Sequence, residues 1–440
     1  MKRSLLTLAL LGISLSAAAG PVFLPSGENL TYGEAGNHQS LLAYTNNPAV
    51  GASSLGMSSW NFGMALPISS FGVGLEVGPV DDMAKDIDAL SAELQKFETA
   101  DPTIDDINGI KTKFDSFLEN AGASGYLGLN VGFHVPFFPI VWSSADVLGG
   151  SVVFDSNMGI QAKLAILDSP IEYNPLAQGA NQLQTNSAAY IKLGAVSESS
   201  FGYSRPVFEY GNGNLYAGLR AKYYMVGLTK ALVGLSQMDG ADAAINDKVS
   251  EVQDDFQPET GVGIDLGLMW VAPNYRVGAT FKNVNSPSFN YDTIGVDCET
   301  KTGPSQDSCY IAKSYANEID TQETYVMDAQ VSVEAAYFNS SRNLVLNFAA
   351  DTSPVHDTVA NEVQWMTVSA AYATSNLIIP GVRVGYRKNL AGSALSAATA
   401  GFTLFKMLHL DLAYGLESID VDGAPQPRLA QVNLGLDLLF

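Results

Sequence analysis

Apolar and polar residues alternate along much of this chain. The last nine residues carry apolar side chains at every second position from Val432 to Phe440, with Leu439 as the one exception to the alternation. A period of two is typical of a β-strand that has one apolar face. The same pattern recurs at residues 71–78, 127–135, 215–225, 262–270, 382–387 and 408–414. The hydrophobic pattern therefore predicts an all-β, antiparallel fold.

The two faces of these strands differ in a way that favours a membrane barrel. One face is apolar, and the other carries Gly, Ala, Asn and single charges. The segments approach the ~9–11 residues that a tilted strand needs to cross a bilayer. Aromatic residues stand near segment ends, as in interfacial girdles, at Tyr223, Trp270, Tyr337, Tyr372, Tyr386 and Tyr414.

We therefore predict a closed transmembrane β-barrel of about 14 strands, an even number being expected. An array of extracytoplasmic β-sandwiches and a β-helix are the alternatives, but neither requires girdles or an aromatic terminus. The final strand, which ends at Phe440, resembles the segment by which bacterial outer-membrane barrels are recognised for assembly. That resemblance implies the outer-membrane barrel assembly machinery as a partner, with Phe440 as the assembly signal.

The N-terminus predicts export. Lys2 and Arg3 precede a short apolar run, and small residues follow up to Ala19. This order is typical of a secretory signal peptide over residues 1–19, with a short buried helix as the alternative. Removal of Lys2 and Arg3 changes the formal net charge from -22 to -24.

Three regions break the alternation. Residues 20–57 contain Pro21, Pro25 and Pro48 and resemble a plug or hatch, which leaves residues 58–440 for the barrel. Residues 81–121 carry two apolar stripes at helical spacing, and Thr103 with Asp106 forms a capping-box pattern between them. They predict an inserted helical hairpin whose stripes pack together, a partner or membrane-surface role being the alternative. Residues 236–258 form an acidic, weakly helical insertion.

Composition narrows the possible chemistry. A net charge of -22 disfavours nucleic-acid binding. The 2 Cys residues exclude a Cys-built zinc cluster, and export makes a disulfide between Cys298 and Cys309 the better prediction. No motif indicates a cofactor, a metal or a catalytic residue. His134 and His409 fall on expected lumen faces, so a barrel enzyme stays open as a third hypothesis, behind a His in a polar network.

Charged residues on the expected lumen face are the best site candidates, because a charge within the membrane must face a cavity or a partner. They either line a polar path or pair with one another and with the plug. These candidates are Glu76, Arg220, Lys222, Asp265, Arg383, Arg387, Asp411 and Asp437.

Short motifs carry a family resemblance. The Asn47-Pro48-Ala49 motif before the first strands resembles FadL-like outer-membrane proteins, which are channels for fatty acids and hydrophobic compounds. The segments 220–224, 263–267 and 281–287 are similar to the conjugal-transfer TraF-type group of barrels. The resemblance implies a monomer whose hatch is held by Asn47, Pro48 and Ala49, with hydrophobic ligands passing through it or leaving sideways.

We accordingly expect a bacterial outer-membrane protein that acts as a passive channel for small hydrophobic molecules. The alternative is a structural or interaction role in a conjugation or secretion apparatus, which the helical and acidic insertions favour. The expected partners are membrane lipid, the assembly machinery and a small hydrophobic ligand, with no nucleic acid and no cofactor.

Overall fold

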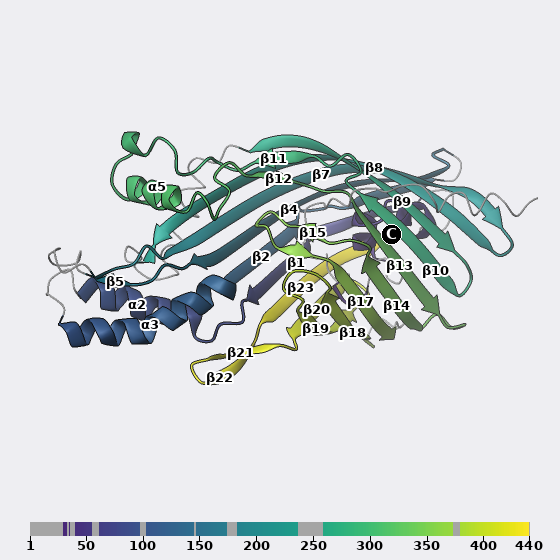
Figure 1. The fold of residues 1–440 in the computed structure, drawn as a ribbon. Helices are drawn as coiled ribbons and strands as arrows, with labels where there is room; N and C mark the ends of the chain where they lie inside the picture. Colours follow the sequence, from purple (N-terminus) through teal and green to yellow (C-terminus); the bar gives the residue numbers. More distant parts are fainter. Residues whose placement is uncertain are drawn as a thin grey trace, which may run out of the picture.

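A computed structural model describes residues 30–32, 35, 40–54, 61–96, 103–144, 147–173, 183–235, 258–372 and 379–439. The expected signal peptide, nearly all of the acidic insertion and Phe440 lie outside these residues. Helices and strands keep the labels of Figure 1.

Fifteen of the described strands form one closed antiparallel sheet (Figure 1). The first strand pairs with the last, which closes the ring. β2 and β3 occupy successive parts of the same position between β1 and β4, so the fifteen strands of this sheet make a barrel of fourteen, which confirms the predicted fold. The wall consists of β1 (Asn61–Val77), β2 (Tyr126–His134), β3 (Ile140–Ser144), β4 (Gly150–Leu167), β7 (Ala188–Tyr210), β8 (Gly213–Gly234), β9 (Glu259–Val271), β10 (Tyr275–Lys282), β13 (Gln330–Phe338), β14 (Leu344–Asp351), β17 (Trp365–Tyr372), β18 (Gly381–Asn389), β19 (Ser396–Leu404), β20 (Leu408–Gly415) and β23 (Leu429–Leu439).

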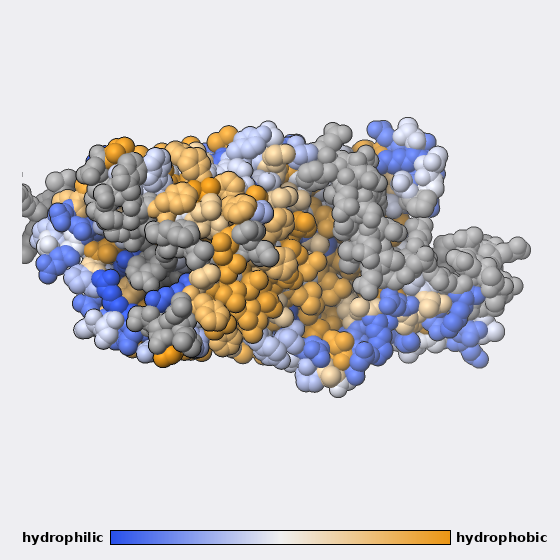
Figure 2. Space-filling model, turned by 180° about the vertical axis from the view of Figure 1, so that it is seen from behind, coloured by the Kyte–Doolittle hydropathy of each residue, from blue (hydrophilic) through white to orange (hydrophobic). Residues whose placement is uncertain are grey.

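Alternate side chains along each strand have opposite environments. On β8, Leu219 is 52% exposed whereas its neighbour Arg220 is 3% exposed. Hydrophobic residues cover the middle of the molecule and hydrophilic ones gather toward both ends (Figure 2). The barrel therefore has the apolar outer belt that lipid requires, as expected for the bacterial outer membrane. None of the helices in the described residues is both long and apolar enough to cross a bilayer.

The two ends of the barrel differ in their connections. The helices at residues 83–124 and 304–314 lie toward one end, while the last strand finishes at the other, where β7 and β8 are joined by a two-residue turn (Figure 1). Outer-membrane barrels have short periplasmic turns and longer extracellular loops. This rule places the inserted helices on the extracellular side. The short hairpins are β5–β6 (Glu172–Tyr173, Leu183–Gln184), β11–β12 (Ser288–Asn290, Thr324–Val326), β15–β16 (Val355–His356, Glu362–Val363) and β21–β22 (Ser418–Val421, Ala424–Pro427).

Residues 81–124 contain the helices α2 (Met83–Lys96) and α3 (Ile104–Ser124). The predicted capping box at the start of α3 is confirmed, with Thr103 and Asp106 exchanging backbone and side-chain hydrogen bonds. The apolar stripes of both helices pack against Leu164, Ile166 and Ile191. On β4 these leucine and isoleucine positions share the outward face with the exposed Ile160. The hairpin therefore covers the outside of the wall above the lipid belt.

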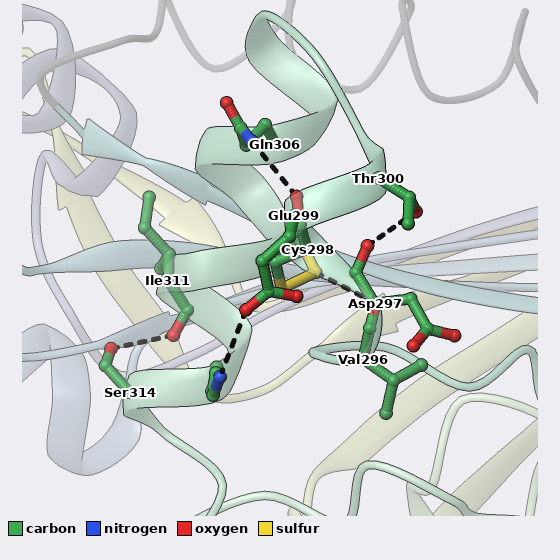
Figure 3. The surroundings of a disulfide bond; sticks show 10 residues. Val296, Asp297, Cys298, Glu299, Thr300, Gln306, Ile311 and Ser314 are labelled. Carbon is green, nitrogen blue, oxygen red and sulfur yellow. Dashed lines mark hydrogen bonds and ion pairs between the residues drawn. A yellow bond between two sulfur atoms is a disulfide. The ribbon is translucent and has the colours of Figure 1, made fainter.

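The long connection between β10 and β13 packs on the inner face of β7 and β8. It contains β11, β12, the short η5 helix (Cys298–Thr300) and α5 (Pro304–Ser314). The predicted Cys298–Cys309 disulfide is present and joins η5 to α5, where Gln306 donates a hydrogen bond to the carbonyl of Cys298 at 3.1 Å (Figure 3). Ala312 and Tyr315 of α5 pack against Ala188 and Leu232.

The N-terminal segment lies against inward-facing wall residues. Its η2 helix (Leu41–Thr45) and α1 helix (Val50–Ser54) form a cluster with Val141, Val153 and Met269, among others. Farther back in the chain, Leu30 packs against Leu395 and Leu429 near the extracellular end. The segment thus follows the lumen along the barrel axis.

Candidate functional site

A buried ion network centred on Asp265 joins β7, β8 and β9. The Asp265 carboxylate lies 2.6 Å from a terminal nitrogen of Arg220 and 2.8 Å from the Lys222 ammonium. Lys222 also lies 3.6 Å from Glu198 of β7. These four residues are each at most 6% exposed. They are the inward residues of neighbouring strands, so alternation alone brings them together once the register is set.

The three segments that resemble TraF-type proteins meet at this network. Asp265 accepts a hydrogen bond at 2.8 Å from the backbone amide of Asn283, and Tyr224 donates to the side-chain oxygen of Asn283 at 2.7 Å. Arg220 and Tyr224 come from the first segment, Asp265 from the second and Asn283 from the third. Their common role in the structure is to tie β8, β9 and the end of β10 together.

The same network holds the N-terminal segment. Arg220 donates hydrogen bonds to the carbonyl oxygens of Thr45 and, at 3.1 Å, Asn46. These carbonyls lie at the C-terminal end of the η2 helix, where backbone oxygens lack helical partners. Because a guanidinium has several donors, Arg220 can hydrogen-bond to Asp265 and to the N-terminal segment at the same time.

The Asn47-Pro48-Ala49 motif forms a turn that is fixed to the wall. The side-chain oxygen of Asn47 accepts from the Ala49 amide at 2.9 Å, and its nitrogen donates to Glu334 at 3.0 Å. Glu334 also accepts a hydrogen bond from the Ala35 amide at 2.6 Å. One inward carboxylate on β13 thus holds two points of the N-terminal segment.

A second ion pair holds the start of the described segment. Arg383 and Asp411, on β18 and β20, lie 2.5 Å apart at their nearest charged atoms. The other Asp411 oxygen accepts from the Thr31 amide at 3.0 Å, and the Arg383 guanidinium lies 6.0 Å from the Tyr32 ring. The lumen charges in these two places pair with one another and with the N-terminal segment.

The remaining candidates lie elsewhere. Glu76 is half-buried near the extracellular end and accepts from the Tyr126 hydroxyl at 2.5 Å. Arg387 is 6% exposed and its guanidinium lies 3.8 Å from the centre of the Trp365 ring. Both line a cavity of about 610 Å³. The side chain of Asp437 and the whole of Phe440 lie outside the described part of the chain.

The wall itself is interrupted beside the lumen. Residues 135–139, between β2 and β3, stand opposite only two residues of β4, since His134 pairs with Asn157 and Ile140 with Phe154. Residues 66–69 of β1 likewise stand opposite one residue of β23. Two adjacent strands therefore each carry three residues more than their outer neighbours.

His134 and Asp155 face inward at this interruption. His134 is 6% exposed and its ring nitrogen lies 3.4 Å from Asp155, which is 2% exposed. His409 lies elsewhere, with its ring nitrogen 3.1 Å from the Thr403 hydroxyl. In the part of the chain that the structure describes, no three His, Cys, Asp or Glu side chains form a metal-ligand group.

Several residues of these networks were not among the sequence candidates. Glu334 is a single carboxylate within a mainly apolar strand segment, Glu198 lies in a serine-rich one, and Asp155 lies in a segment with weak alternation. The sequence does indicate that these carboxylates face the lumen, because an isolated charge in a membrane strand must face inward. What the sequence lacks is the identity of the partner, such as Asn47 for Glu334.

Comparison with known proteins gives one family match and several likenesses in fold. No curated protein matches the sequence. The toluene transporter TodX of Pseudomonas putida is 14% identical, with a TM-score of 0.36 over 96% of this chain and 99% of that one. The Ralstonia pickettii toluene transporter TbuX is 10% identical, with a TM-score of 0.31 over 97% and 100%. Outer membrane phospholipase A of Escherichia coli is 8% identical, with a TM-score of 0.26 over 85% and 98%.

The family match covers most of the chain. The model described as "F plasmid transfer operon, TraF, protein" matches residues 44–351, from the η2 helix to the end of β14. This range includes Arg220, Asp265 and Asn283, so the predicted TraF-type resemblance is confirmed. The chain is an outer-membrane β-barrel that belongs to the F plasmid transfer operon TraF protein family.

Proposed function

We propose that this barrel is a passive channel for small hydrophobic molecules, which enter at the extracellular end and leave sideways into the bilayer. The observation that carries the proposal is a break in regular pairing on two adjacent wall strands: the register of β1 shifts at residues 66–69, and residues 135–139 separate β2 from β3. A continuous ladder of backbone hydrogen bonds is the default in lipid, because unpaired backbone groups are costly there. Elsewhere in the described wall the pairing shifts by a single residue, between Pro206 and Phe208, so three extra residues on each of two adjacent strands favour a function for this place.

The filled lumen supports a sideways exit. The N-terminal segment packs against inward residues of β4, β8, β9, β13, β14 and β17. Asn47, Pro48 and Ala49 hold it at Glu334 and against Gly218 and Gly267. We propose that this segment is the plug, so that movement along the axis to the periplasm would require its displacement. Movement through the break would not.

The composition of the break suits an apolar molecule. Its residues are Val135, Pro136, Phe137, Phe138 and Pro139, and Phe137 is 46% exposed. Two prolines there lack the amide hydrogens that a regular strand would need to pair. The inner side at this level carries a polar pair, His134 with Asp155.

Deletion of residues 67–69 together with residues 136–138 tests this exit. The double deletion removes the three extra residues from each strand and restores one-to-one pairing with β4 and β23. In proteoliposomes, the wild-type protein should take up a hydrophobic fluorescent probe faster than empty liposomes do, and the straightened barrel should lose this difference.

Deletion of residues 421–423, at the tip of the β21–β22 hairpin, is the matched control. It removes the same number of residues outside the wall and should leave uptake unchanged. Equal uptake by wild-type and empty liposomes would refute the channel. Uptake that survives straightening would refute the sideways exit alone.

A platform in a conjugation apparatus is the second candidate, because the family description names a plasmid transfer operon. The α2–α3 hairpin packs outside the wall rather than in the lumen, so its outer surface is available to a partner. Co-purification of surface or periplasmic proteins with the wild type, lost when residues 81–124 are deleted, would favour this role.

A further inference from the structure

A polar cavity of about 610 Å³ lies near the extracellular end of the lumen. Inward residues of β1, β2, β4, β18 and β23 line its sides, and the β15–β16 hairpin and the end of α3 border it. The β14–β17 connection is anchored across the lumen, because Thr358 hydrogen-bonds to Gln161 of β4 at 2.5 Å. The volume is within the range of small-molecule sites.

One buried cation in this cavity, Arg387, has hydrogen-bond donors without a partner among the described residues. Arg387 is 6% exposed, and its Nε and one terminal nitrogen have no hydrogen-bond partner among the described residues. Trp365 covers one face of the guanidinium at 3.8 Å. The stacking leaves the guanidinium edge for hydrogen bonding, and a buried donor without a partner is unfavourable.

Three carboxylates line the cavity, and among the described residues none of them forms an ion pair with Arg387: Glu76, Asp357 and Glu362. Glu76 accepts a hydrogen bond from the Tyr126 hydroxyl, and Asp357 accepts hydrogen bonds from Val359 and Asn361 at 2.7–3.0 Å. Two more cations line the cavity: Lys163 lies 5.3 Å from the Tyr126 ring, and Arg428 donates to the Val77 carbonyl at 3.0 Å. In the described part of the chain, neither of these cations has a carboxylate within ion-pair distance. The lining thus carries three cations and three carboxylates, and it is the open donors of the buried Arg387 that suit an anion.

We propose that this cavity is a binding site for a small, polar organic carboxylate. The free edge of Arg387 matches a carboxylate in a bidentate arrangement. Trp365 and Tyr126 supply aromatic surface for the body of the ligand. The many amide and charged groups of the lining disfavour a long aliphatic chain, because each would lose its water against apolar carbon.

This ligand class differs from the hydrophobic cargo proposed above, and the site does not depend on that proposal. A barrel that passes no hydrophobic probe can still bind a carboxylate at its mouth. Loss of binding and loss of uptake are measured separately, so one can fail without the other.

Calorimetric titration of the detergent-solubilised protein with benzoate tests the site, with benzamide as the uncharged analogue of the same shape. We expect benzoate to bind at millimolar or lower concentration and benzamide to bind about tenfold more weakly or worse, since hydrogen bonds to a charged group are stronger. Arg387→Gln should weaken benzoate binding by about tenfold or more, whereas Arg387→Lys should retain part of it.

Arg276→Gln is the matched control, because Arg276 is another wall arginine at 6% exposure with a terminal nitrogen that lacks a partner, and it does not line the cavity. It should leave benzoate binding unchanged. Arg387→Lys keeps the positive charge and serves as the test if Arg387→Gln fails to fold. Absence of benzoate binding, equal binding of benzamide, or unchanged binding in both Arg387 variants would overturn the proposal. Displacement of benzoate by inorganic phosphate at lower concentration would overturn its assignment to carboxylates.

Discussion

At the scale of single residues, two inward glycines allow the N-terminal segment to approach the wall. A Cβ added at Gly218 would lie 2.4 Å from backbone atoms of Pro48, and one added at Gly267 would lie 2.8 Å from the Ala49 amide nitrogen. The backbone at Pro48 and Ala49 cannot move away from an added Cβ as easily as the end of a flexible side chain could. Gly in these strands therefore marks a close approach of another part of the chain.

Gly218→Ala should displace the Pro48 turn. We expect it to lower the free energy of unfolding by about 1–3 kcal/mol, the usual cost of overpacking. It should also speed proteolysis of the segment around residues 40–54. Gly202→Ala is the control, because its added Cβ would meet nothing closer than 3.6 Å. Thermal unfolding in detergent compares the two, and an equal loss in both would contradict the proposed contact.

Asp265→Asn should destabilise the barrel strongly, because Asp265 serves both Arg220 and Lys222. Removal of one partner of a buried ion pair typically costs about 3–5 kcal/mol, since a buried charge remains uncompensated. The midpoint of denaturant unfolding measures the effect. Glu299→Gln, at a 4.0 Å pair whose side chains are 58% and 70% exposed, should change that midpoint little. A similar small shift for Asp265→Asn would refute the central role of the network.

At the scale of elements, the tall strands explain where the insertions pack. β7 and β8 have 23 and 22 residues, about twice the ~9–11 that cross a bilayer. Their extracellular parts therefore need protein on both faces instead of lipid. The α2–α3 hairpin covers the outside, while α5 and β11–β12 cover the inside.

The capping box of α3 should make the start of this helix sensitive to acid. Hydrogen bonds from the Thr103 side chain and backbone hold the pKa of Asp106 below its usual 3.8. A carboxyl with a lowered folded-state pKa stabilises the fold above its unfolded pKa, and this stabilisation is lost as the pH falls through the folded value. We expect amide protection factors in the first turn of α3 to fall relative to those of α2 as the pH drops below 3.8.

Asp106→Asn should remove this pH dependence and lower protection at neutral pH. Asp105→Asn, also in the first turn but outside the capping box, is the control and should leave both unchanged. Equal behaviour of the two variants in hydrogen exchange would show that the box does not stabilise the helix.

At the scale of the whole molecule, the outer belt should reject charge. Leu266 is 42% exposed on the outward face of β9, next to the buried Asp265. Leu266→Arg should destabilise the barrel by about 2–4 kcal/mol if it lies near the middle of the bilayer. Val421→Arg, at a 37% exposed position of the β21–β22 hairpin outside the wall, should be nearly neutral. Unfolding in lipid vesicles measures both, and equal effects would contradict a lipid-facing belt.

Much of this architecture could be predicted from the sequence, because strand period and face composition are local properties. Residues 215–225 show Leu219 outward and Arg220 inward without any knowledge of their neighbours. The same holds for the capping box at Thr103 and for the short-range pairing of Cys298 with Cys309. Each depends on residues a few positions apart.

The sequence by itself therefore determined that this chain forms paired strands with a lipid-facing side and a polar side, together with an amphipathic helical insertion. The tertiary structure decided which charges meet, on which side of the wall the helices pack and where the ladder is interrupted. These features depend on contacts such as Asn47 with Glu334, which are 287 positions apart. Alternation places a residue on a face and excludes a one-residue slip of the register, but it does not select which inward residues of neighbouring strands meet or which strands close the barrel.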